Sequence, residues 1–216
     1  MTDPIKLVIC IPTAGTVRMG FAYSLAGMIA KLGADRVPTI PEAVVEVKMD
    51  VIESSNWIEN REQAAMRAVD TGMTHLMFID DDTVFEAHIL EVLLGRRQPI
   101  VCVNYLIKTP ECDAFVAVGL DGKRVVTRES STGLVPIAYS GFGVSLFDTK
   151  VFQAIPQPWF LPEWDAEKRR YTTEDNPFYR KAREAGFTVY LDQDASKLVT
   201  GHLGTKSWNY LEYKDG

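Results

Sequence analysis

Residues 74–82 read THLMFIDDD, a short apolar run that ends in three consecutive aspartates, Asp80, Asp81 and Asp82. A continuous apolar run of this length is typical of a strand that is buried on both faces of a parallel sheet. Three adjacent carboxylates repel one another, so they favour a cation beside them. Mg²⁺ and Mn²⁺ prefer oxygen ligands and can bridge carboxylates to phosphate groups. We therefore expect a divalent metal at the end of this strand, with a solvated turn as the plain alternative.

The segments around this strand alternate between strand and helix patterns through the first half of the chain. Gly33 is expected to end the first helix, and Asn56 with Glu59 forms a capping-box pattern at the start of the second. Such alternation predicts a parallel sheet covered by helices on both faces, with ligands beyond the carboxyl ends of the strands. The expected strands are residues 6–12, 44–51, 74–79 and 100–106, and the expected helices are residues 16–31, 56–71 and 86–94.

The second half of the chain has a less regular pattern. Asp121-Gly122, between residues 115–120 and 125–128, is a strong signal for a β-hairpin. Thr172 and Asp175 form a further capping-box pattern at the start of a helix. We find no independent domain boundary, so one α/β domain is expected over residues 1–216. The remaining expected segments are strands at 141–147 and 188–191, a loop at 156–162 and a helix at 172–185.

The composition excludes several classes of protein. The 216 residues are 46% hydrophobic and 24% charged, which is ordinary for a globular chain, and no apolar stretch is long enough for a membrane span. The formal net charge of −6 disfavours broad binding to nucleic acids or anionic membranes. Cys10, Cys102 and Cys112 have no C-x-x-C spacing, which argues against a disulfide framework or a zinc site. Because Met1–Pro4 lacks a signal-peptide pattern, we expect a cytoplasmic location, in the host cytoplasm if the source is viral.

Two further motifs carry side chains of the kinds that catalyse reactions or bind metals. Glu174-Asp175 begins a predicted helix, where negative charge is favoured, so simple capping is the alternative to a catalytic role. His202 lies between Gly201 and Gly204 and is an acceptable ligand for Mn²⁺, with an ordinary loop histidine as the alternative. Neither motif identifies a function by itself.

The order and spacing of these motifs together are more informative than any one of them. Over residues 5–204 the chain resembles glycosyltransferases of the GT-A fold, and among them most closely glycosyltransferase family 2. The resemblance implies a mostly parallel central sheet flanked by helices, with a small β hairpin on the acceptor side. The motifs that carry it are Ile-Pro-Thr at 11–13, Glu-Asn-Arg at 59–61, FIDDD at 78–82, SGFG at 140–143, TEDNPF at 173–178 and Gly-His at 201–202.

The resemblance implies a donor side that binds a nucleotide-diphosphate sugar, with UDP-sugars favoured over GDP-sugars. Metal ligands for Mn²⁺ or Mg²⁺ would be Asp82 and His202, with Asp80 contacting the metal or the ribose. The family often has an acidic pair after the second strand, where this chain reads MDVIE at 49–53, so the acid that contacts the base stays open. The remaining residues assigned to nucleotide binding are Thr13, either Asp50 or Glu53, Arg61 and Asp81.

On the acceptor side, the resemblance implies that Asp175 is the general base of an inverting reaction and that Glu174 holds the acceptor. The acceptor would carry a free hydroxyl and could be a glycan, a lipid-linked sugar, a protein, a metabolite or a modified nucleic-acid base. Position and composition also suggest an aromatic platform for the acceptor and a C-terminal lid over the nucleotide. The platform would consist of Trp159, Phe160, Trp164 and Tyr139, with ordinary core or loop packing of these aromatics as the alternative. The lid would consist of Lys206, Trp208 and Tyr210.

Within the single domain, residues 1–108 are expected to form the nucleotide-sugar-binding half, and residues 109–216 the acceptor-side half with the tail. Two other functions remain open. A nucleotidylyltransferase also uses a doubly wound sheet with acidic metal ligands, but the segment at 12–18 lacks the glycine-rich, basic pattern of that class. A catalytically silent nucleotide-sugar-binding module would retain the fold without the reaction. The sequence does not indicate an oligomeric state.

Overall fold

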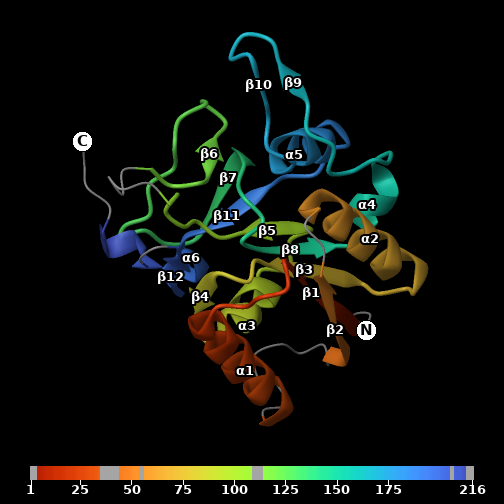
Figure 1. Ribbon diagram of the computed structural model, residues 1–216, viewed down its shortest axis with the longest axis vertical. Helices are drawn as coiled ribbons and strands as arrows, with labels where there is room; N and C mark the ends of the chain where they lie inside the picture. Colours follow the sequence, from red (N-terminus) through yellow and green to blue (C-terminus); the bar gives the residue numbers. More distant parts are fainter. Residues whose placement is uncertain (1–3, 35–43, 54–55, 109–113, 205–206, 213–216) are drawn as a thin grey trace.

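The computed structural model describes residues 4–34, 44–53, 56–108, 114–204 and 207–212 (Figure 1). Strands and helices alternate through the first half, and shorter elements follow in the second. In chain order they are β1 (Ile5–Thr13), α1 (Met19–Ala34), β2 (Val44–Glu53), α2 (Trp57–Asp70), β3 (His75–Ile79), β4 (Thr83–Phe85), α3 (Ile89–Gly95), β5 (Ile100–Cys102), β6 (Val118–Gly119), β7 (Leu134–Tyr139), β8 (Val144–Asp148), α4 (Lys150–Ala154), β9 (Trp164–Asp165), β10 (Arg170–Tyr171), α5 (Asp175–Glu184), β11 (Tyr190–Asp192), α6 (Gln193–Ser196), β12 (Val199–Leu203), β13 (Ser207–Trp208) and a 3₁₀ turn, η1 (Tyr210–Glu212).

An eight-stranded sheet forms the centre of the molecule, in the order β2-β1-β3-β8-β5-β11-β7-β6. β1 pairs in parallel with β2 and β3, and β5 pairs in parallel with β11. β8 lies antiparallel between β3 and β5, and β7 lies antiparallel between β11 and β6. Six of the eight strands therefore run in one direction, which makes the sheet mixed but mostly parallel.

Helices cover both faces of this sheet (Figure 1). α2, α4 and α5 pack on one face, whereas α1, α3 and α6 pack on the other. Side chains of β1 alternate between the two layers: Val8 and Cys10 belong to the first, and Leu7, Ile9 and Ile11 to the second. Because both faces are buried, β1 needs a nearly continuous apolar run, which is the pattern that its sequence shows.

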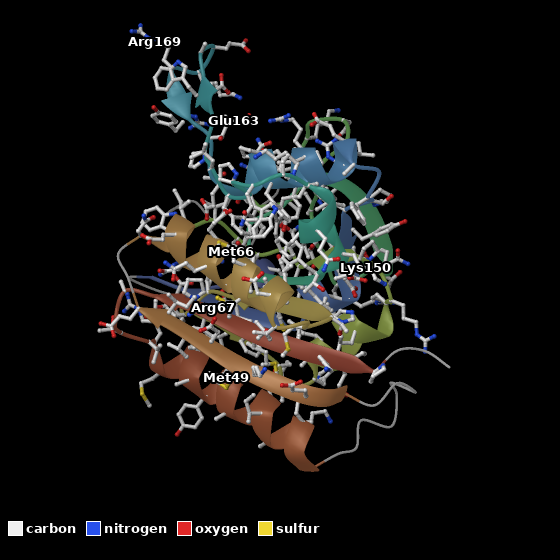
Figure 2. All side chains as sticks on the ribbon, turned by 90° about the vertical axis from the view of Figure 1, so that its right-hand side faces the viewer. Met49, Met66, Arg67, Lys150, Glu163 and Arg169 are labelled. Carbon is white, nitrogen blue, oxygen red and sulfur yellow. The ribbon has the colours of Figure 1, made fainter. Side chains whose placement is uncertain are left out.

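Two small sheets lie beside the central one. β4, β12 and β13 form an antiparallel sheet in which His202 pairs with Thr83, the residue after Asp82. The Leu203 amide donates a hydrogen bond of 2.7 Å to the Asp82 carbonyl. β9 and β10 form a hairpin that projects from the body of the molecule (Figures 1 and 2), with Arg169 at its tip. The first small sheet brings the tail of the chain to the end of β3.

The elements predicted for the first half are present, with shifted ends. The Asn56 side chain caps α2 by accepting a 3.3 Å hydrogen bond from the Glu59 amide, which confirms that capping pattern. Gly33 does not end α1, because the helix continues to Ala34. The strand expected at 100–106 ends at Cys102, and the Asn104 amide instead donates to the Ser196 hydroxyl.

The second half departs further from expectation. The turn at Asp121-Gly122 forms, but residues 125–128 are not a strand, and β6 pairs with β7 instead. Thr172 is not part of a capping box, because its hydroxyl accepts a hydrogen bond from the Glu163 amide at 2.9 Å. Both errors follow from long-range pairing, which a local pattern does not report.

The predicted aromatic platform is wrong for two of its members. Trp159 and Phe160 are buried in the core, at 5% and 0% exposure. The Glu62 carboxylate accepts hydrogen bonds from both of their backbone amides, which fixes this proline-rich loop against α2. Among the described residues, no helix has the length and apolarity needed to cross a membrane.

Candidate active site

A cavity of about 570 Å³ lies at the carboxyl ends of β1 and β3. This is the edge at which ligands of parallel α/β sheets bind. Asp80, Asp81 and Asp82 reach it directly after β3, and other segments of the chain contribute its remaining walls. The lining residues are Pro12, Thr13, Ala14, Trp57, Asn60, Arg61, Asp80, Asp81, Asp82, Glu174 and His202.

Arg61 links the two acidic motifs across the floor of this cavity. Its Nη2 donates to Asp80 Oδ1 at 2.6 Å, and its Nε lies 3.4 Å from Glu174 Oε1. The guanidinium is 4% exposed and lies 5.1 Å from the ring centroids of both Phe78 and Phe142. Burial acts to lower the pKa of Arg61, but Asp80 and Glu174 outweigh it and raise the pKa. A permanently charged arginine therefore joins the end of β3 to the start of α5.

Asp82 has two neighbours that can carry positive charge. Lys108 Nζ forms an ion pair with Asp82 Oδ2, and His202 Nε2 lies 3.5 Å from Asp82 Oδ1. Burial acts to raise the pKa of Asp82, but the contacts with His202 and Lys108 lower it below the ordinary value. The carboxylate is therefore ionised at neutral pH and available to a cation.

Contacts with Leu106 and Tyr105 fix the orientation of the His202 ring. Its Nδ1 lies 2.8 Å from the Leu106 carbonyl oxygen, which can only accept, so Nδ1 carries the hydrogen. Nε2 then faces Asp82 and carries a lone pair in the neutral ring or a hydrogen in the protonated ring. The Tyr105 ring packs edge-on against His202 at 4.9 Å, and its hydroxyl accepts a hydrogen bond from the Gly143 amide. This is the arrangement in which a histidine is prepared to bind a metal.

The glycine-rich segment at 140–143 makes room for Tyr105. A Cβ atom at Gly141 would lie 2.1 Å from the Tyr105 hydroxyl, and one at Gly143 would lie 2.7 Å from the Tyr105 ring. Neither position accepts a side chain without moving Tyr105. The two glycines therefore influence the placement of His202 indirectly, through Tyr105.

Asp82 and the residues around it could supply only part of the coordination shell of a metal ion. Asp82 Oδ1 is buried and has no hydrogen-bond partner among the described residues, and His202 Nε2 lies 3.5 Å from it. The described part of the chain brings no three His, Cys, Asp or Glu side chains together as a metal site. Mg²⁺ and Mn²⁺ sites in phosphate-binding enzymes often use one or two protein ligands, with phosphate oxygens and waters completing the shell. The donor set is compatible with that kind of site.

Asp81 lies between its neighbours in the same cavity. Burial raises the pKa of Asp81, Thr13 opposes this shift, and the adjacent Asp82 and Asp80 add to it. Thr13 itself, at the end of β1, accepts a 3.2 Å hydrogen bond from the Gly15 amide. Thr13 is therefore placed beside the aspartates as the sequence predicted.

Asp50 and Glu53 are not lining residues of this cavity. Asp50 pairs with Arg67 of α2 at 3.0 Å, on the body of β2. Glu53 ends β2 directly opposite Thr13, and a Cβ atom at Gly15 would lie 2.7 Å from its Oε1. Of the two acids left open by the sequence, Glu53 is the one at the carboxyl end of the sheet.

Asp175 lies in a second cavity, of about 360 Å³, on the other side of Glu174. Burial raises the pKa of Asp175 from 3.8 to about 6, against a hydrogen bond from the Thr173 hydroxyl that lowers it. A carboxylate with a pKa near neutrality is suited to accept a proton. Tyr139 lines this second cavity, which is the one platform residue placed beside Asp175.

The predicted lid is placed only in part. Lys206 lies outside the described residues. β13, which contains Trp208, pairs with β12 at His202, and Tyr210 packs against the buried pair Leu106 and Phe115. The tail is therefore close to His202, while Tyr210 belongs to a small apolar cluster.

Sequence reasoning did not assign three residues of the first site. Trp57 and Asn60 line the cavity from α2, and Lys108 pairs with Asp82. Lys108 falls in a segment that follows a predicted strand, so its position offered a weak signal. Trp57 is 57% exposed beside a polar cavity, and only the fold places it there.

Neither a protein-family model nor a curated protein matches the chain. Solved structures do match it in fold. A197 from STIV is 18% identical with a TM-score of 0.55, over 87% of this chain and 81% of that one. The 4-diphosphocytidyl-2C-methyl-D-erythritol synthase from Anaerococcus prevotii is 10% identical with a TM-score of 0.50, over 92% and 94%.

The chain therefore shares with these two structures a mixed α/β fold, in which a mostly parallel sheet is flanked by helices on both faces. Residues 1–349 of S. aureus TarS also match, at 12% identity and a TM-score of 0.47, over 88% of this chain and 58% of that one. At these identities the likeness concerns the fold alone. Open α/β sheets bind ligands beyond the carboxyl ends of their parallel strands, and the acidic cavity lies at that edge.

Proposed function

We propose that this chain is a glycosyltransferase that moves a sugar from a nucleotide-diphosphate sugar to an acceptor hydroxyl. One observation carries the proposal: two carboxylates adjacent in the sequence, Glu174 and Asp175, line two different cavities. Glu174 lines the cavity with Asp80, Asp82 and His202, whereas Asp175 lines the other. A donor in the first cavity and an acceptor in the second would approach each other at this boundary.

The first cavity has the features of a donor site. Its volume of about 570 Å³ lies within the range of about 300–1,000 Å³ that is usual for small-molecule sites. Thr13 and Glu53 lie at the strand ends where the ribose would sit, and exposed Trp57 offers a face on which a base would stack. UDP-sugars are favoured over GDP-sugars as donors.

Asp82 and His202 would hold Mn²⁺ or Mg²⁺, with Asp80 as a further contact. The metal would supply charge stabilisation for the departing diphosphate. Arg61 keeps Asp80 in place through the 2.6 Å hydrogen bond between them. Its Nη1 and Nε atoms have no hydrogen-bond partner among the described residues, and Arg61 itself lines the cavity, so it adds positive potential there.

Asp175 would act as the general base. It takes the proton of the acceptor hydroxyl while the hydroxyl oxygen bonds to the anomeric carbon. The bond from that carbon to the diphosphate oxygen breaks, and the nucleoside diphosphate leaves with the bonding electrons. Glu174, held by Arg61 at 3.4 Å, orients the boundary between the two cavities. Attack from the face opposite the leaving group inverts the anomeric configuration.

Nucleotide-sugar binding is the first test. We expect a UDP-sugar to raise the melting temperature in the presence of Mn²⁺, because a ligand that binds only the folded state stabilises it. The screen should cover UDP-, GDP-, dTDP- and CDP-sugars, each with Mn²⁺, Mg²⁺ or EDTA. If none stabilises the protein under any of these conditions, the proposed donor site is wrong.

A nucleotidylyltransferase remains the second candidate, because the synthase from Anaerococcus prevotii shares this fold. The two reactions differ in their products. A glycosyltransferase releases a nucleoside diphosphate from a nucleotide sugar, whereas a nucleotidylyltransferase releases pyrophosphate from a nucleoside triphosphate and a sugar phosphate. A silent binding module would be stabilised by a nucleotide sugar without hydrolysing it. Measuring both products with Mn²⁺ present separates the three functions.

A further inference from the structure

The second cavity carries more positive charge than the chain as a whole would suggest. The formal net charge of the protein is −6, yet Arg124, Lys168 and Arg170 all line this one cavity of about 360 Å³. They come from the turn after β6 and from the β9–β10 hairpin. The acidic side chains among the lining residues are Asp165 and Asp175.

One of the three cations is already neutralised. Lys168 Nζ forms an ion pair with Asp165 Oδ2 at 2.9 Å, within the hairpin. Within the described part of the chain, Arg170 forms no ion pair. Arg124 Nη1 donates a 2.6 Å hydrogen bond to the Val116 carbonyl, which fixes one edge of its guanidinium, and no carboxylate of the described residues forms an ion pair with it. Arg124 and Arg170 therefore remain as two cations that share a cavity with the proposed base.

The hairpin that carries Arg170 is anchored at its base. The Thr172 amide donates to the Glu163 carbonyl at 2.8 Å, and Arg180 of α5 pairs with the Glu163 carboxylate at 2.6 Å. Figure 2 shows Glu163 at the base of the hairpin and Arg169 at its tip. Arg170 is thus held on the side of the hairpin that lines the cavity, one residue from a tip arginine that does not line it.

Aromatic and hydroxyl groups complete the cavity. Tyr139 and Tyr171 line it, and the Tyr171 ring packs edge-on against Trp164 at 5.2 Å. Aromatic faces bind the apolar side of a sugar ring, and Thr173 and Asn176 offer polar groups around it. The cavity therefore has a base at one end, an aromatic wall and two uncompensated arginines.

We propose that the second cavity takes an anionic acceptor, one whose phosphate or carboxylate group pairs with Arg124 and Arg170 while its hydroxyl lies at Asp175. Arginine is suited to this role because its planar donors match the oxygens of phosphate and carboxylate groups. The proposal rests on the proposed glycosyltransferase function, and it names the class of acceptor. It also explains why the cations lie beside Asp175, where a neutral acceptor would need none.

The charge recognition can be tested without knowing the acceptor. The probe is inorganic phosphate, titrated at constant ionic strength with UDP and Mn²⁺ present so that the donor cavity is filled. The readout is the ¹H–¹⁵N side-chain resonances of Arg170 and Trp164 by NMR. We expect both to shift saturably with phosphate, and the Trp164 shift to be lost in the Arg124→Gln, Arg170→Gln double variant.

Arg169→Gln is the matched control, since it removes the same charge one residue away and outside the cavity. It should leave the Trp164 shift intact, and a thermal melt should show that all the variants are folded. The proposal is overturned if phosphate shifts neither resonance in the parent protein. It is also overturned if the Arg169→Gln variant and the double variant respond alike.

Acceptor preference gives the second test and distinguishes phosphate from carboxylate. Glucose, glucose 6-phosphate and glucuronic acid form one matched set, and glycerol, glycerol 3-phosphate and glycerate another. We expect the anionic members to be used with a higher kcat/KM, and Arg124→Gln or Arg170→Gln to raise their KM by about tenfold, as loss of a charge-assisted hydrogen bond predicts. Equal or better use of the neutral members would contradict the proposal.

Donor hydrolysis separates this proposal from the function on which it rests. Hydrolysis of the nucleotide sugar without an acceptor should be unchanged in Arg124→Gln and Arg170→Gln, because neither residue lines the donor cavity. If hydrolysis persists while the phosphate response is absent, the acceptor class is wrong and the proposed function stands. If the parent protein neither binds nor hydrolyses any nucleotide sugar, the proposed function itself fails.

Discussion

The two cavities differ in how their side chains are held. In the first, Arg61 is 4% exposed and fixed between Asp80 and Glu174, and His202 is oriented by a carbonyl and a packed tyrosine. In the second, Tyr171 is 68% exposed and belongs to a projecting hairpin. The difference indicates that the first site is built for one fixed chemistry, whereas the second can vary with the ligand that it must recognise.

The largest effect is expected for Asp175→Asn, which keeps the shape of the second cavity and removes its proposed base. We expect transfer to fall by about 10²–10⁴-fold, the usual contribution of a general base, with donor binding unchanged. The rates of transfer and the donor affinity are measured on the same preparation. Asp165→Asn, in the same cavity, is the control and should keep most of the activity. Transfer at the parent rate would remove Asp175 from the mechanism.

Removing the proposed metal ligands should affect the first cavity alone. Asp82→Ala and His202→Ala should each weaken Mn²⁺ binding by more than about 100-fold, since even outer-shell partners contribute about 10–100-fold. Calorimetric titration with Mn²⁺ and with UDP gives the affinity for the metal and the affinity for the nucleotide. Asp50→Ala serves as the control, because Asp50 pairs with Arg67 away from the cavity. Parent-like affinity in both variants would show that the metal site is assigned incorrectly.

The role of buried Arg61 in the first cavity can be tested by measuring the free energy of unfolding. Arg61→Met leaves Asp80 and Glu174 without their cation, and breaking a buried ion pair costs about 3–5 kcal/mol. Arg67→Met removes a half-exposed arginine from the same helix (labelled in Figure 2) and should cost less than about 1 kcal/mol. Urea denaturation measures both changes in the free energy of unfolding. Similar losses in the two variants would mean that Arg61 does not organise the site.

The pH dependence should report Asp175. Its pKa is about 6, and the base must be ionised to accept a proton, so kcat/KM should fall about tenfold per pH unit below that value. The stability of the folded protein depends on pH in the opposite direction. Because the folded pKa exceeds the ordinary value of 3.8, the stability contributed by the protonated form is lost as the pH rises through about 6. Asp175→Asn should therefore stabilise the protein at neutral pH, by up to about 3 kcal/mol. A kcat/KM that does not change between pH 3.8 and about 6 would contradict the assignment. An Asp175→Asn variant that is less stable than the parent protein would contradict it as well.

Lys108→Met should have the smallest effect. Lys108 pairs with the carboxylate that is proposed to bind the metal, so the ammonium group and the metal compete for Asp82. Removing Lys108 should tighten Mn²⁺ binding several-fold in the absence of nucleotide, as expected for a partly exposed pair worth about 1 kcal/mol or less. Lys150→Met, at the exposed start of α4, is the matched control. Weaker Mn²⁺ binding in Lys108→Met would mean that the lysine assists the metal rather than competing with it.

The sequence predicted the parts of this molecule that depend on local pattern. β1 and β3 are continuous apolar runs because both of their faces are buried, and the Asn56 cap is a contact within four residues. The resemblance of ordered motifs grouped Asp80, Asp82 and His202, and all three line one cavity, while their role as metal ligands stays a prediction. These features are encoded where they occur in the chain.

The sequence did not predict what depends on distant partners. β12 reads VTGHL, which has no strand pattern, and it forms a strand because it pairs with β4. Trp159 and Phe160 were predicted to belong to a platform for the acceptor, but the Glu62 carboxylate holds their backbone against α2 and their side chains are buried. The pairing of Lys108 with Asp82 likewise joins two single residues with no motif between them. Such contacts depend on the assembled fold, not on any one segment.

Arg61 has a consequence for how binding in one cavity would affect binding in the other. One guanidinium serves two carboxylates, one in each acidic motif, at 2.6 Å and 3.4 Å. When a cation on the donor side engages Asp80, Arg61 shifts its attraction toward Glu174 at the boundary with the second cavity. Linkage requires that each ligand then change the affinity for the other by the same factor. Binding in the proposed donor cavity and binding in the proposed acceptor cavity would therefore be coupled through Arg61, with neither order of binding preferred by the coupling itself.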